Sequence, residues 1–454
     1  MTRAWIADLP LAAEADVCVV GSGAAGATAA IAAARDGASV VLVEQLPFLG
    51  GTSTAVLDTF YGFWTPGDAP RKVVGGIADE VVAGLRALGP VVERPNTYGA
   101  GTGLTYVAEH LKVVWERLAS EAGVRILLHA MLQDAAVDPG GHVRAIVVAT
   151  KAGLRRIAAR TFVDASGDAD LCAYAGFGYE TAGELDPAQT LTTTFRMANV
   201  DRERRRSITT RELHAAMAEA AADGYDLPRR EGSDHVTPIE GVTATIMTRL
   251  APNARGAGGD HGRLVDTTDP AFLTAAEIAG RRQALEYARF LVDRVPGYER
   301  ASLVALGTRI GVRETRRVHG DARLTRDDVL AARRFDDQVG LSGAPIEDHR
   351  AGPDTRWAYL PPGAAVGIPF GTLVVRDAVN VLVAGRCFSA THDAHAAVRS
   401  MAQCMAMGQA AGSAAAMATG AEGDGAVRAV DVAKLQERLT DAGAILDLAV
   451  ERAA

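Results

Sequence analysis

The sequence predicts an α/β fold in which a second domain interrupts a dinucleotide-binding domain, and three observations support this. Residues 17–44 alternate between apolar runs and a glycine-rich turn in the order strand, helix, strand. From about residue 183 to residue 349 the composition shifts to arginine clusters, helical stretches and longer loops, and strand-like runs then return. The chain has 454 residues, of which 48% are apolar, so two domains with sizeable cores are expected.

The first segment contains one βαβ unit of about 30 residues. "DVCVV", residues 16–20, is a short apolar run typical of a buried parallel strand. Residues 24–35 are rich in alanine and contain no proline, which predicts a helix that ends at Gly37. "SVVLVE", residues 39–44, predicts the next buried strand.

The rest of the chain shows similar patterns. Helical spacing over residues 104–122 is followed by a strand-like run and by a β-meander over 131–163. The alanine- and methionine-rich run over 401–418 predicts a buried helix. We therefore expect four parts: a first part of the dinucleotide-binding domain over 14–182, an inserted domain over 183–355, a second part over 356–421 and a surface helical tail over 422–454.

Composition excludes several classes of partner. The net charge of -8 would repel a phosphate backbone, so we expect no nucleic acid partner. Polar residues interrupt the least polar run, which argues against a membrane span. The N-terminus lacks a signal-peptide pattern. The cysteines are scattered and form no CxxC pair, which suits a reducing cytoplasm and argues against a zinc site: Cys18, Cys172, Cys387 and Cys404.

The glycine-rich turn "GSGAAG", residues 21–26, carries a dinucleotide-binding fingerprint because it follows a strand and opens a helix. Gly21 permits the tight turn, Gly23 lets the backbone approach a pyrophosphate, and Gly26 lets helix and sheet pack closely. Glu44 ends the second strand, where a carboxylate accepts hydrogen bonds from the ribose hydroxyls of an adenosine. It would repel a 2′-phosphate, which disfavours NADP.

Both NAD and FAD fit this fingerprint, and the next segment separates them. "LGGTSTA", residues 49–55, supplies two glycines and several hydroxyl groups just beyond Glu44. Such a loop can follow the pyrophosphate and ribityl chain of a longer cofactor, whereas an NAD enzyme has no need of it. The pattern therefore favours FAD.

Four segments resemble the FAD-dependent oxidoreductases of the glutathione-reductase-like superfamily, in the branch related to fumarate reductase and succinate dehydrogenase flavoproteins. They begin with "VVGSGAAGATAAIAAARDGASVVLVEQLPFLGGTST", followed by "TFVDASGDADLCAYAG". The other two are "GTRIGVRETRRVHGDARLTRDDV" and "NVLVAGRCFSATHDAHAAVRSMAQCMAMGQAAGSAAA". The resemblance covers nearly the whole chain. It implies a doubly wound, Rossmann-like FAD-binding domain with an inserted α+β cap or substrate domain.

The resemblance also implies which residues hold the cofactor. The ADP half is assigned to Gly21, Gly23, Ala24, Ala25, Gly26, Glu44, Gln45, Gly51 and Thr52. Residues near the pyrophosphate and adenosine are Ala165, Gly167 and Asp168, and residues along the ribityl chain and flavin are Gly385, Arg386 and Ser389. The helix over 401–418 would point its N-terminus at the flavin pyrimidine edge, where its partial positive charge stabilises an anionic reduced flavin.

The chain departs from the resemblance at two points that concern cofactor binding. "GGTST" carries no histidine, so the covalent flavin–histidine bond of succinate dehydrogenases is absent and FAD is expected to bind non-covalently. A second GxGxxG motif for NAD(P)H is also missing. The chain therefore differs from enzymes of the glutathione reductase type, which have two nucleotide domains.

The expected catalytic groups follow the flavin-contacting segment. His392 and His395 are candidates for general acid or base, and Arg399 is a candidate clamp for a carboxylate or another anion. Arg313, in "RIGVRETRRVHG", is a further candidate that reaches into the cleft from the cap side. Structural roles stay open for each of the four.

Two other features have open alternatives. Tyr61, Phe63 and Trp64 follow the glycine loop and either line a substrate pocket or belong to the core. Cys387 is either a redox group beside the flavin or a small buried apolar residue.

The sequence thus predicts an FAD-dependent oxidoreductase that transfers a hydride between a small organic substrate and flavin N5, as a dehydrogenase or a reductase. One alternative is an oxidase or monooxygenase that uses dioxygen. Another is a non-catalytic flavoprotein or electron-transfer subunit. The substrate and the electron acceptor or donor are unknown, and a homodimer is compatible with the resemblance. We expect a cytoplasmic protein without a membrane partner.

Overall fold

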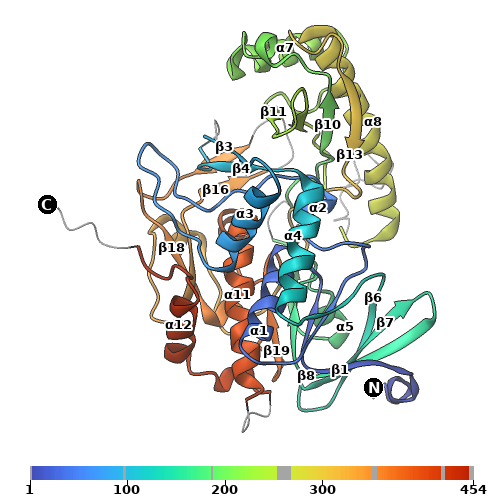
Figure 1. Ribbon diagram of the computed structural model, residues 1–454, viewed down its shortest axis with the longest axis vertical. Coiled ribbons are helices and arrows are strands. Elements are labelled where there is room, and N and C mark those ends of the chain that lie inside the picture. Colours follow the sequence, from blue (N-terminus) through green and yellow to red (C-terminus); the bar gives the residue numbers. More distant parts are fainter. Residues whose placement is uncertain are drawn as a thin grey trace, which may run out of the picture.

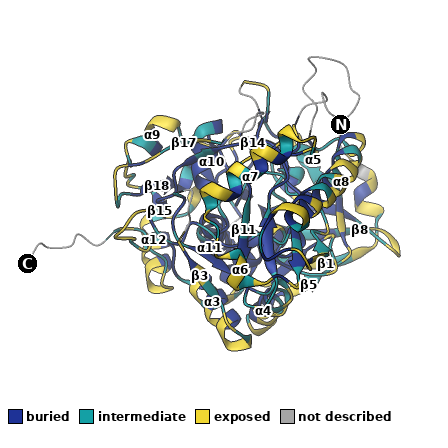
Figure 2. Ribbon diagram, turned by 90° about the horizontal axis from the view of Figure 1, so that it is seen from above, coloured by how far each residue is buried: buried dark blue, intermediate teal, exposed yellow. Residues whose placement is uncertain are grey.

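The computed structural model describes residues 3–95, 99–185, 188–252, 267–349, 355–420 and 425–448 (Figure 1). A large domain built around a parallel sheet carries a smaller domain, the cap, at the top of Figure 1. Exposed residues gather on outer helices such as α7 (Thr210–Ala222) and α8 (Pro270–Arg294) (Figure 2). Within the described ranges, none of the helices is both long and apolar enough to cross a membrane.

The central sheet has the strand order β5-β2-β1-β8-β7-β6, and β19 also pairs with β8. Its parallel part contains β1 (Leu11–Val20), β2 (Val40–Val43), β5 (Arg125–Leu127), β8 (Gly153–Asp164) and β19 (Val381–Val383). The strands β6 (Met131–Val137) and β7 (Val143–Thr150) continue it as an antiparallel meander that leads into β8. The predicted βαβ unit and the predicted meander are both confirmed.

The register of this sheet brings four chain segments to one edge. Val20 pairs with Val43 and with Asp164, and Asp164 also pairs with Val383. All four strands run in the same direction, so their carboxyl ends meet there. The residues that follow these strands therefore lie side by side, although they are separated by up to several hundred positions in sequence.

Helix α1 (Ala24–Arg35) lies against α11 (Met401–Ala418), and glycines set the distance between them. A Cβ atom on Gly408 would lie 2.2 Å from the carbonyl oxygen of Ala25, and one on Gly412 would lie 2.1 Å from that of Ala29. These glycines are four positions apart, so they face the same side of α11. Both helices are almost completely buried, as their alanine-rich sequences predict.

Further elements cover the sheet. The helices are α2 (Thr52–Ala55), α3 (Ile77–Leu88), α4 (Ala108–Glu121), α5 (Asp170–Ala175), α9 (Arg326–Leu330), α10 (His392–Val398) and α12 (Val432–Asp441). Two-stranded pairs join β3 (Val92–Arg94) with β4 (Gly103–Thr105), β9 (Tyr179–Thr181) with β14 (Arg316–Val318), β15 (Gln338–Ser342) with β18 (Val366–Pro369), and β16 (Ile346–Asp348) with β17 (Arg356–Ala358). Short 3₁₀ helices span Ala4–Asp8, Phe370–Thr372 and Val427–Ala429. The helix predicted over 104–122 begins only at Ala108, because the preceding residues pair in β4.

The cap has its own antiparallel sheet and its own core. The sheet has the order β11 (Ser233–Val236), β12 (Thr243–Ile246), β10 (Phe195–Ala198), β13 (Ser302–Leu306). Its helices are α6 (Arg202–Arg205), α7 and α8. Helix α7 begins with a capping box between Thr209 and Glu212, and Asp269 caps α8 just before Pro270. A cluster of buried apolar side chains between Phe195 and Ala301 holds these elements together.

The apolar cores suggest narrower limits for the inserted domain than residues 183–355. Val318, Leu324 and Leu341 fall inside that range, but they pack into the core of the large domain. We propose that the inserted domain extends from about residue 188 to residue 313. Helix α12, in the predicted surface tail, likewise buries Leu435 and Leu439 in the large core, while residues 421–424 and 449–454 lie outside the described ranges.

The α1–α11 contact predicts a measurable loss of stability. Replacing Gly408 by Ala places a methyl group against backbone that cannot move aside, so we expect a loss of about 2 kcal/mol in the free energy of unfolding. Urea denaturation measures this change. In the control Gly420→Ala the nearest atom lies 3.4 Å from the new Cβ, and stability should stay within about 0.5 kcal/mol of the native protein. Equal stabilities of the two variants would contradict the proposed role of Gly408.

Candidate active site

A cavity of about 690 Å³ opens at the carboxyl edge of the parallel sheet, between the large domain and the cap. Its size lies in the range of sites for cofactors and small molecules. Most of the residues predicted to hold the cofactor line it: Gly21, Gly23, Ala24, Ala25, Glu44, Gln45, Gly51, Thr52, Ala165, Gly167, Asp168, Gly385 and Arg386. Gly26 and Ser389 are absent from the wall. A Cβ on Gly26 would lie 1.8 Å from the oxygen of Gly21, so this glycine serves close packing.

The two glycine loops touch each other at the cavity wall. Gly21 has a φ of 89°, in the region that favours glycine, and its amide donates to the oxygen of Val43. Gly23 forms a bridge with Gly50, and a Cβ on Gly51 would lie 2.7 Å from Gly23 Cα. In contrast, a Cβ on Gly23 would meet no protein atom within 4 Å. The space in front of the α1 N-terminus is therefore open to a ligand.

The carboxylate of Glu44 is fixed beside this loop. Its Oε2 accepts hydrogen bonds from Ser22 N at 2.9 Å and from Ser22 Oγ at 2.6 Å, and its Oε1 accepts from Leu46 N at 2.8 Å. An ionised carboxylate only accepts and has about four lone-pair sites, so it can still accept from hydroxyl groups of a ligand. The geometry fits a ribose-binding role.

Arg386 joins three of the predicted segments. It donates to Asp168 Oδ1 at 2.5 Å and to Thr315 Oγ1 at 2.9 Å, and Thr315 donates in turn to Asp168 at 2.8 Å. Burial works to raise the pKa of Asp168, but the charges of Arg386 and Arg309 hold it below its usual value. The guanidinium therefore lies at the wall with its charge already balanced.

The start of α11 also lines the cavity, through Ser400, Met401 and Cys404. Ser400 is the N-cap residue, and its side chain makes no capping hydrogen bond. Ala402 N donates to the oxygen of Tyr61 at 3.3 Å. The positive end of this helix dipole therefore lies at the cavity wall, and its place at the flavin pyrimidine edge stays a prediction.

The other end of the cavity contains arginines from both domains. Arg229 comes from the cap, Arg313 from the segment after β13, and Arg399 from the end of α10. Burial, together with the charges of Arg399 and Arg229, lowers the pKa of Arg313 to about 9. Burial also lowers the pKa of Arg399. The predicted Arg313 and Arg399 are thus brought together at the cavity wall.

Sequence reasoning missed a pair of neighbouring residues at this end. Glu347 Oε1 lies 2.9 Å from His349 Nε2, and both line the cavity. Burial alone would raise the pKa of Glu347, but its contact and hydrogen bond with His349 and the charge of Arg399 lower it to about 2. Burial, followed by the charge of Arg313, lowers the pKa of His349 to about 3, so this imidazole is neutral. The only signal in the sequence was a short "EDH" run outside every quoted motif.

Tyr61 answers one of the open alternatives, because it lines the cavity whereas Phe63 is buried in the core. The Tyr61 hydroxyl accepts a hydrogen bond from Arg94 and lies 3.4 Å from His235 Nε2 in the cap. Burial, together with the charge of Arg94, lowers the pKa of His235 well below its usual value. A phenol and a neutral imidazole thus meet across the junction of the two domains.

Neither His392 nor His395 lines the cavity, in contrast to our expectation. His395 Nε2 donates to the oxygen of Arg386 at 2.8 Å, which holds the loop that follows β19. Burial, followed by the charge of Arg317, lowers the pKa of His395 well below its usual value. The side chains of both histidines turn into the protein, because they belong to the buried face of α10.

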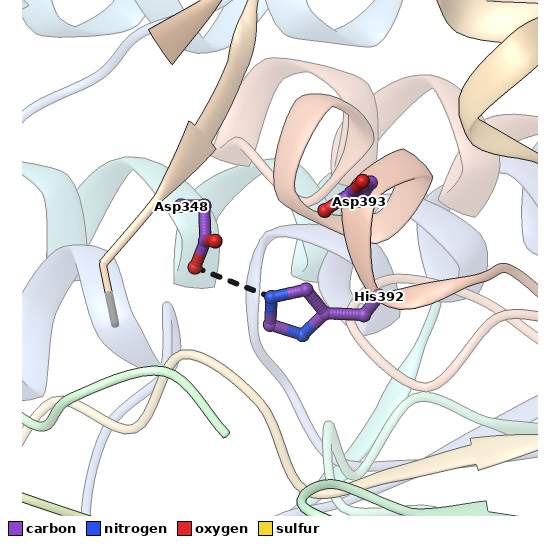
Figure 3. Close-up of side chains that lie close together, drawn as sticks. All are labelled: Asp348, His392 and Asp393. Atoms are coloured by element: carbon purple, nitrogen blue, oxygen red, sulfur yellow. Dashed lines mark hydrogen bonds and ion pairs between the residues drawn. The ribbon is translucent and has the colours of Figure 1, made fainter. Parts of the chain in front are cut away.

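His392 is enclosed by carboxylates. Its Nδ1 lies 3.0 Å from both carboxylate oxygens of Glu314. Its Nε2 lies 3.2 Å from Asp348 Oδ1, the contact drawn in Figure 3. Burial alone would lower the pKa of His392, but these two hydrogen-bonded partners raise it to about 9. Asp393 also lies near, but it forms an ion pair with Arg326 at 3.2 Å. The group is therefore a buried ion-pair network.

Cys387 is a buried free thiol whose Sγ lies 3.5 Å from the oxygen of Asp164. Burial, followed by the charge of Asp164, raises its pKa well above the usual value. A thiol in this environment is not a nucleophile at neutral pH. Of the two alternatives, the buried apolar residue fits the structure.

The family described as FAD dependent oxidoreductase matches residues 16–439, and the chain belongs to this family. FAD is therefore its cofactor. The open space before α1, the fixed Glu44 carboxylate and the helix end at Ser400 fit this cofactor.

Several characterised proteins share local similarity with the chain. A 4-oxocyclohex-2-ene-1-carboxylate 5-dehydrogenase of Sinomonas cyclohexanicum is 40% identical over 103 residues, which are 23% of this chain and 15% of the relative. A 3-oxosteroid 1-dehydrogenase of Mycolicibacterium smegmatis is 40% identical over 111 residues, which are 22% of this chain and 19% of the relative. A fumarate reductase (cytochrome) of Shewanella frigidimarina is 41% identical over 58 residues, with shares of 13% and 10%. The chain thus aligns with less than a fifth of each relative.

Solved structures resemble the chain more distantly. A geranylgeranyl bacteriochlorophyll reductase-like protein of Thermoplasma acidophilum has 12% identity and a TM-score of 0.44, with 94% of this chain and 82% of that chain covered. BexE, described with oxidation during BE-7585A biosynthesis, has 18% identity and a TM-score of 0.47, with shares of 94% and 65%.

The His392 network predicts a pH-dependent stability. The pKa of His392 is raised in the folded protein, so its contribution is complete below about pH 6.5 and is lost as the pH rises through about 9. Replacing His392 by Gln removes the positive charge that lies between the buried carboxylates of Glu314 and Asp348. We expect this change to cost about 3 kcal/mol below pH 6.5 and clearly less above pH 9.

Urea denaturation on either side of this pH window measures the difference between native protein and variant. His110→Gln, at a half-buried position on α4 outside the network, is the control and should show a small, constant difference. If the stability loss of His392→Gln does not change with pH, the pKa of His392 is not raised by these carboxylates.

Proposed function

We propose that the protein transfers a hydride between a small organic substrate and flavin N5, as a dehydrogenase or a reductase. One observation carries this proposal: a single cavity joins the cofactor loops of the large domain to a cluster of polar side chains from the cap. Bound FAD would accept or donate the hydride. The names of the relatives, two dehydrogenases and a reductase, agree with this class of reaction.

The cofactor roles follow from the geometry of the loops. The backbone at Gly23 and Gly51 would cradle the pyrophosphate, and Glu44 would accept hydrogen bonds from the ribose. The positive end of α11, together with Arg386, would lie beside the flavin. No histidine lies in the "GGTST" loop, which supports non-covalent binding.

The substrate roles belong to the groups at the cap-side end. Arg313 and Arg399 would orient the substrate, while Tyr61 with His235 and Glu347 with His349 are the other titratable groups that line this end. We assign positioning roles to the two histidines of α10. His395 holds the carbonyl of Arg386, and His392 holds Glu314, the neighbour of Arg313.

We also propose that the protein works in the cytoplasm. The four cysteines are buried free thiols, which agrees with a reducing cytoplasm. Small molecules are the expected partners. The electron acceptor or donor and a homodimer stay open.

A change of Gly23 to Val tests the cofactor site separately from the fold. The new side chain meets no protein atom within 4 Å at its Cβ, and Gly23 has a φ of -60° that other residues adopt readily. We therefore expect a variant whose flavin content, measured from visible absorption, falls at least about tenfold, and whose melting temperature matches that of native protein stripped of flavin. Gly420→Ala is the control and should keep its flavin. Full flavin content in Gly23→Val would contradict the assigned pyrophosphate site.

The native protein gives the matching test of the reaction. Acid precipitation should release the flavin into the supernatant, and anaerobic addition of a substrate or of a reductant partner should change the flavin absorption. Sustained oxygen consumption without another acceptor would favour the oxidase alternative. A protein that neither contains flavin nor takes up added FAD would refute the proposed function.

A further inference from the structure

The cap-side end of the cavity holds three arginines whose positive charges are not paired with carboxylates in the described part of the chain. Among the described residues, none of Arg229, Arg313 and Arg399 forms an ion pair with a carboxylate. Their hydrogen-bond partners among the described residues are neutral groups. Arg229 donates to the oxygen of Ile246, Arg313 to the oxygen of Thr190 and to Thr192 Oγ1, and Arg399 to Gln189 Oε1 and to the oxygen of Glu347.

Two of these guanidinium groups also have unused donors. The Nε atoms of Arg229 and Arg399 are buried and have no hydrogen-bond partner among the described residues. A buried donor without a partner costs free energy and calls for an explanation. Arg229 is 7% exposed, so bulk water satisfies little of its hydrogen-bonding capacity.

Three other arginines of the chain, two of them at the same cavity, do pair with carboxylates. At the cofactor end of the same cavity, Arg386 pairs with Asp168 at 2.5 Å and Arg316 with Asp170 at 3.0 Å. In the cap, Arg205 pairs with Asp234 at 2.6 Å. The fold thus supplies a carboxylate to these arginines and leaves the three cap-side guanidinium groups without one.

The acidic groups at this end of the cavity do not neutralise this cluster, and nearby Glu314 is already paired with Arg317 and His392. Glu347 is the carboxylate among the arginines, and it lies against His349. Asp58 also lines the cavity, and burial raises its pKa. Even with both ionised, three arginines leave a net positive charge. His235 and His349 are neutral and add none.

We propose that the substrate of this enzyme carries a carboxylate group, which Arg229, Arg313 and Arg399 bind at the cap-side end of the cavity. The planar fork of a guanidinium matches a carboxylate in two parallel hydrogen bonds. Tyr61, Val56, Ala344 and Pro345 supply the apolar and aromatic wall for the rest of the molecule. This inference rests on the proposed function, because it names the substrate class of the same site.

The test uses the purified holoprotein and two pairs of probes that differ in charge but hardly in shape. Acetate is compared with acetamide, and benzoate with benzamide, at constant ionic strength set with sodium chloride. Binding is followed by the change in flavin absorption and by the temperature at which flavin is released. We expect at least one carboxylate to act saturably and its amide to bind about tenfold more weakly or worse.

Variants then locate the binding. Arg313→Gln and Arg399→Gln should each weaken carboxylate binding by about tenfold or more, whereas Arg399→Lys should keep part of it. Arg282→Gln, at an exposed position on α8, is the matched control and should leave binding unchanged. Melting curves identify any variant that fails to fold, and the comparison of carboxylate with amide in the native protein does not depend on them.

The outcomes separate this inference from the function on which it rests. Equal binding of acid and amide, or no saturable effect of either carboxylate, overturns the inference while a flavin-loaded protein keeps the proposed function. Unchanged carboxylate binding in both well-folded Gln variants also overturns it. A purified protein that neither contains nor takes up flavin contradicts the proposed function itself, before carboxylate binding is measured.

Discussion

The close contact between α1 and α11 is the constraint on which the rest of the structure depends. Gly408 and Gly412 allow the backbone of α11 to approach Ala25 and Ala29 of α1 more closely than any side chain would permit. Both helices begin at the same cavity, one at the glycine-rich turn and the other at Ser400. The contact therefore fixes two positive helix ends relative to each other, as a cofactor with a phosphate end and a flavin end requires.

The cavity is assembled from segments that lie far apart in sequence. Parallel strands bring the turns after Val20, Val43, Asp164 and Val383 to one edge, and the cap closes the opposite side with a separate core. Buried ionic groups hold the segments between these two bodies. Arg317 connects Glu180 with Glu314, and Glu314 in turn meets His392. The charged side chains at this junction position the cavity wall without belonging to it.

Much of the cofactor half was predictable because its signals are local. A strand, a glycine turn and a helix follow one another within residues 17–35, and backbone sterics give each glycine a definite role. The substrate half was less predictable. Arg229, His235 and His349 meet through tertiary contacts, and no spacing in the sequence announces them. His392 and His395 were predicted as catalytic groups because they follow Arg386 closely in sequence. Sequence position does not reveal that α10 turns both side chains into the protein.

The separate core of the cap has a consequence for how this protein can change. Phe195, Met217 and Tyr287 belong to a cluster that shares no members with the core around α1 and α11. Mutations that reshape the cap and the groups it presents can accumulate without disturbing the scaffold that holds the flavin. Selection for a new substrate and selection for a bound cofactor thus act on largely independent sets of positions, which allows one flavin scaffold to serve many reactions.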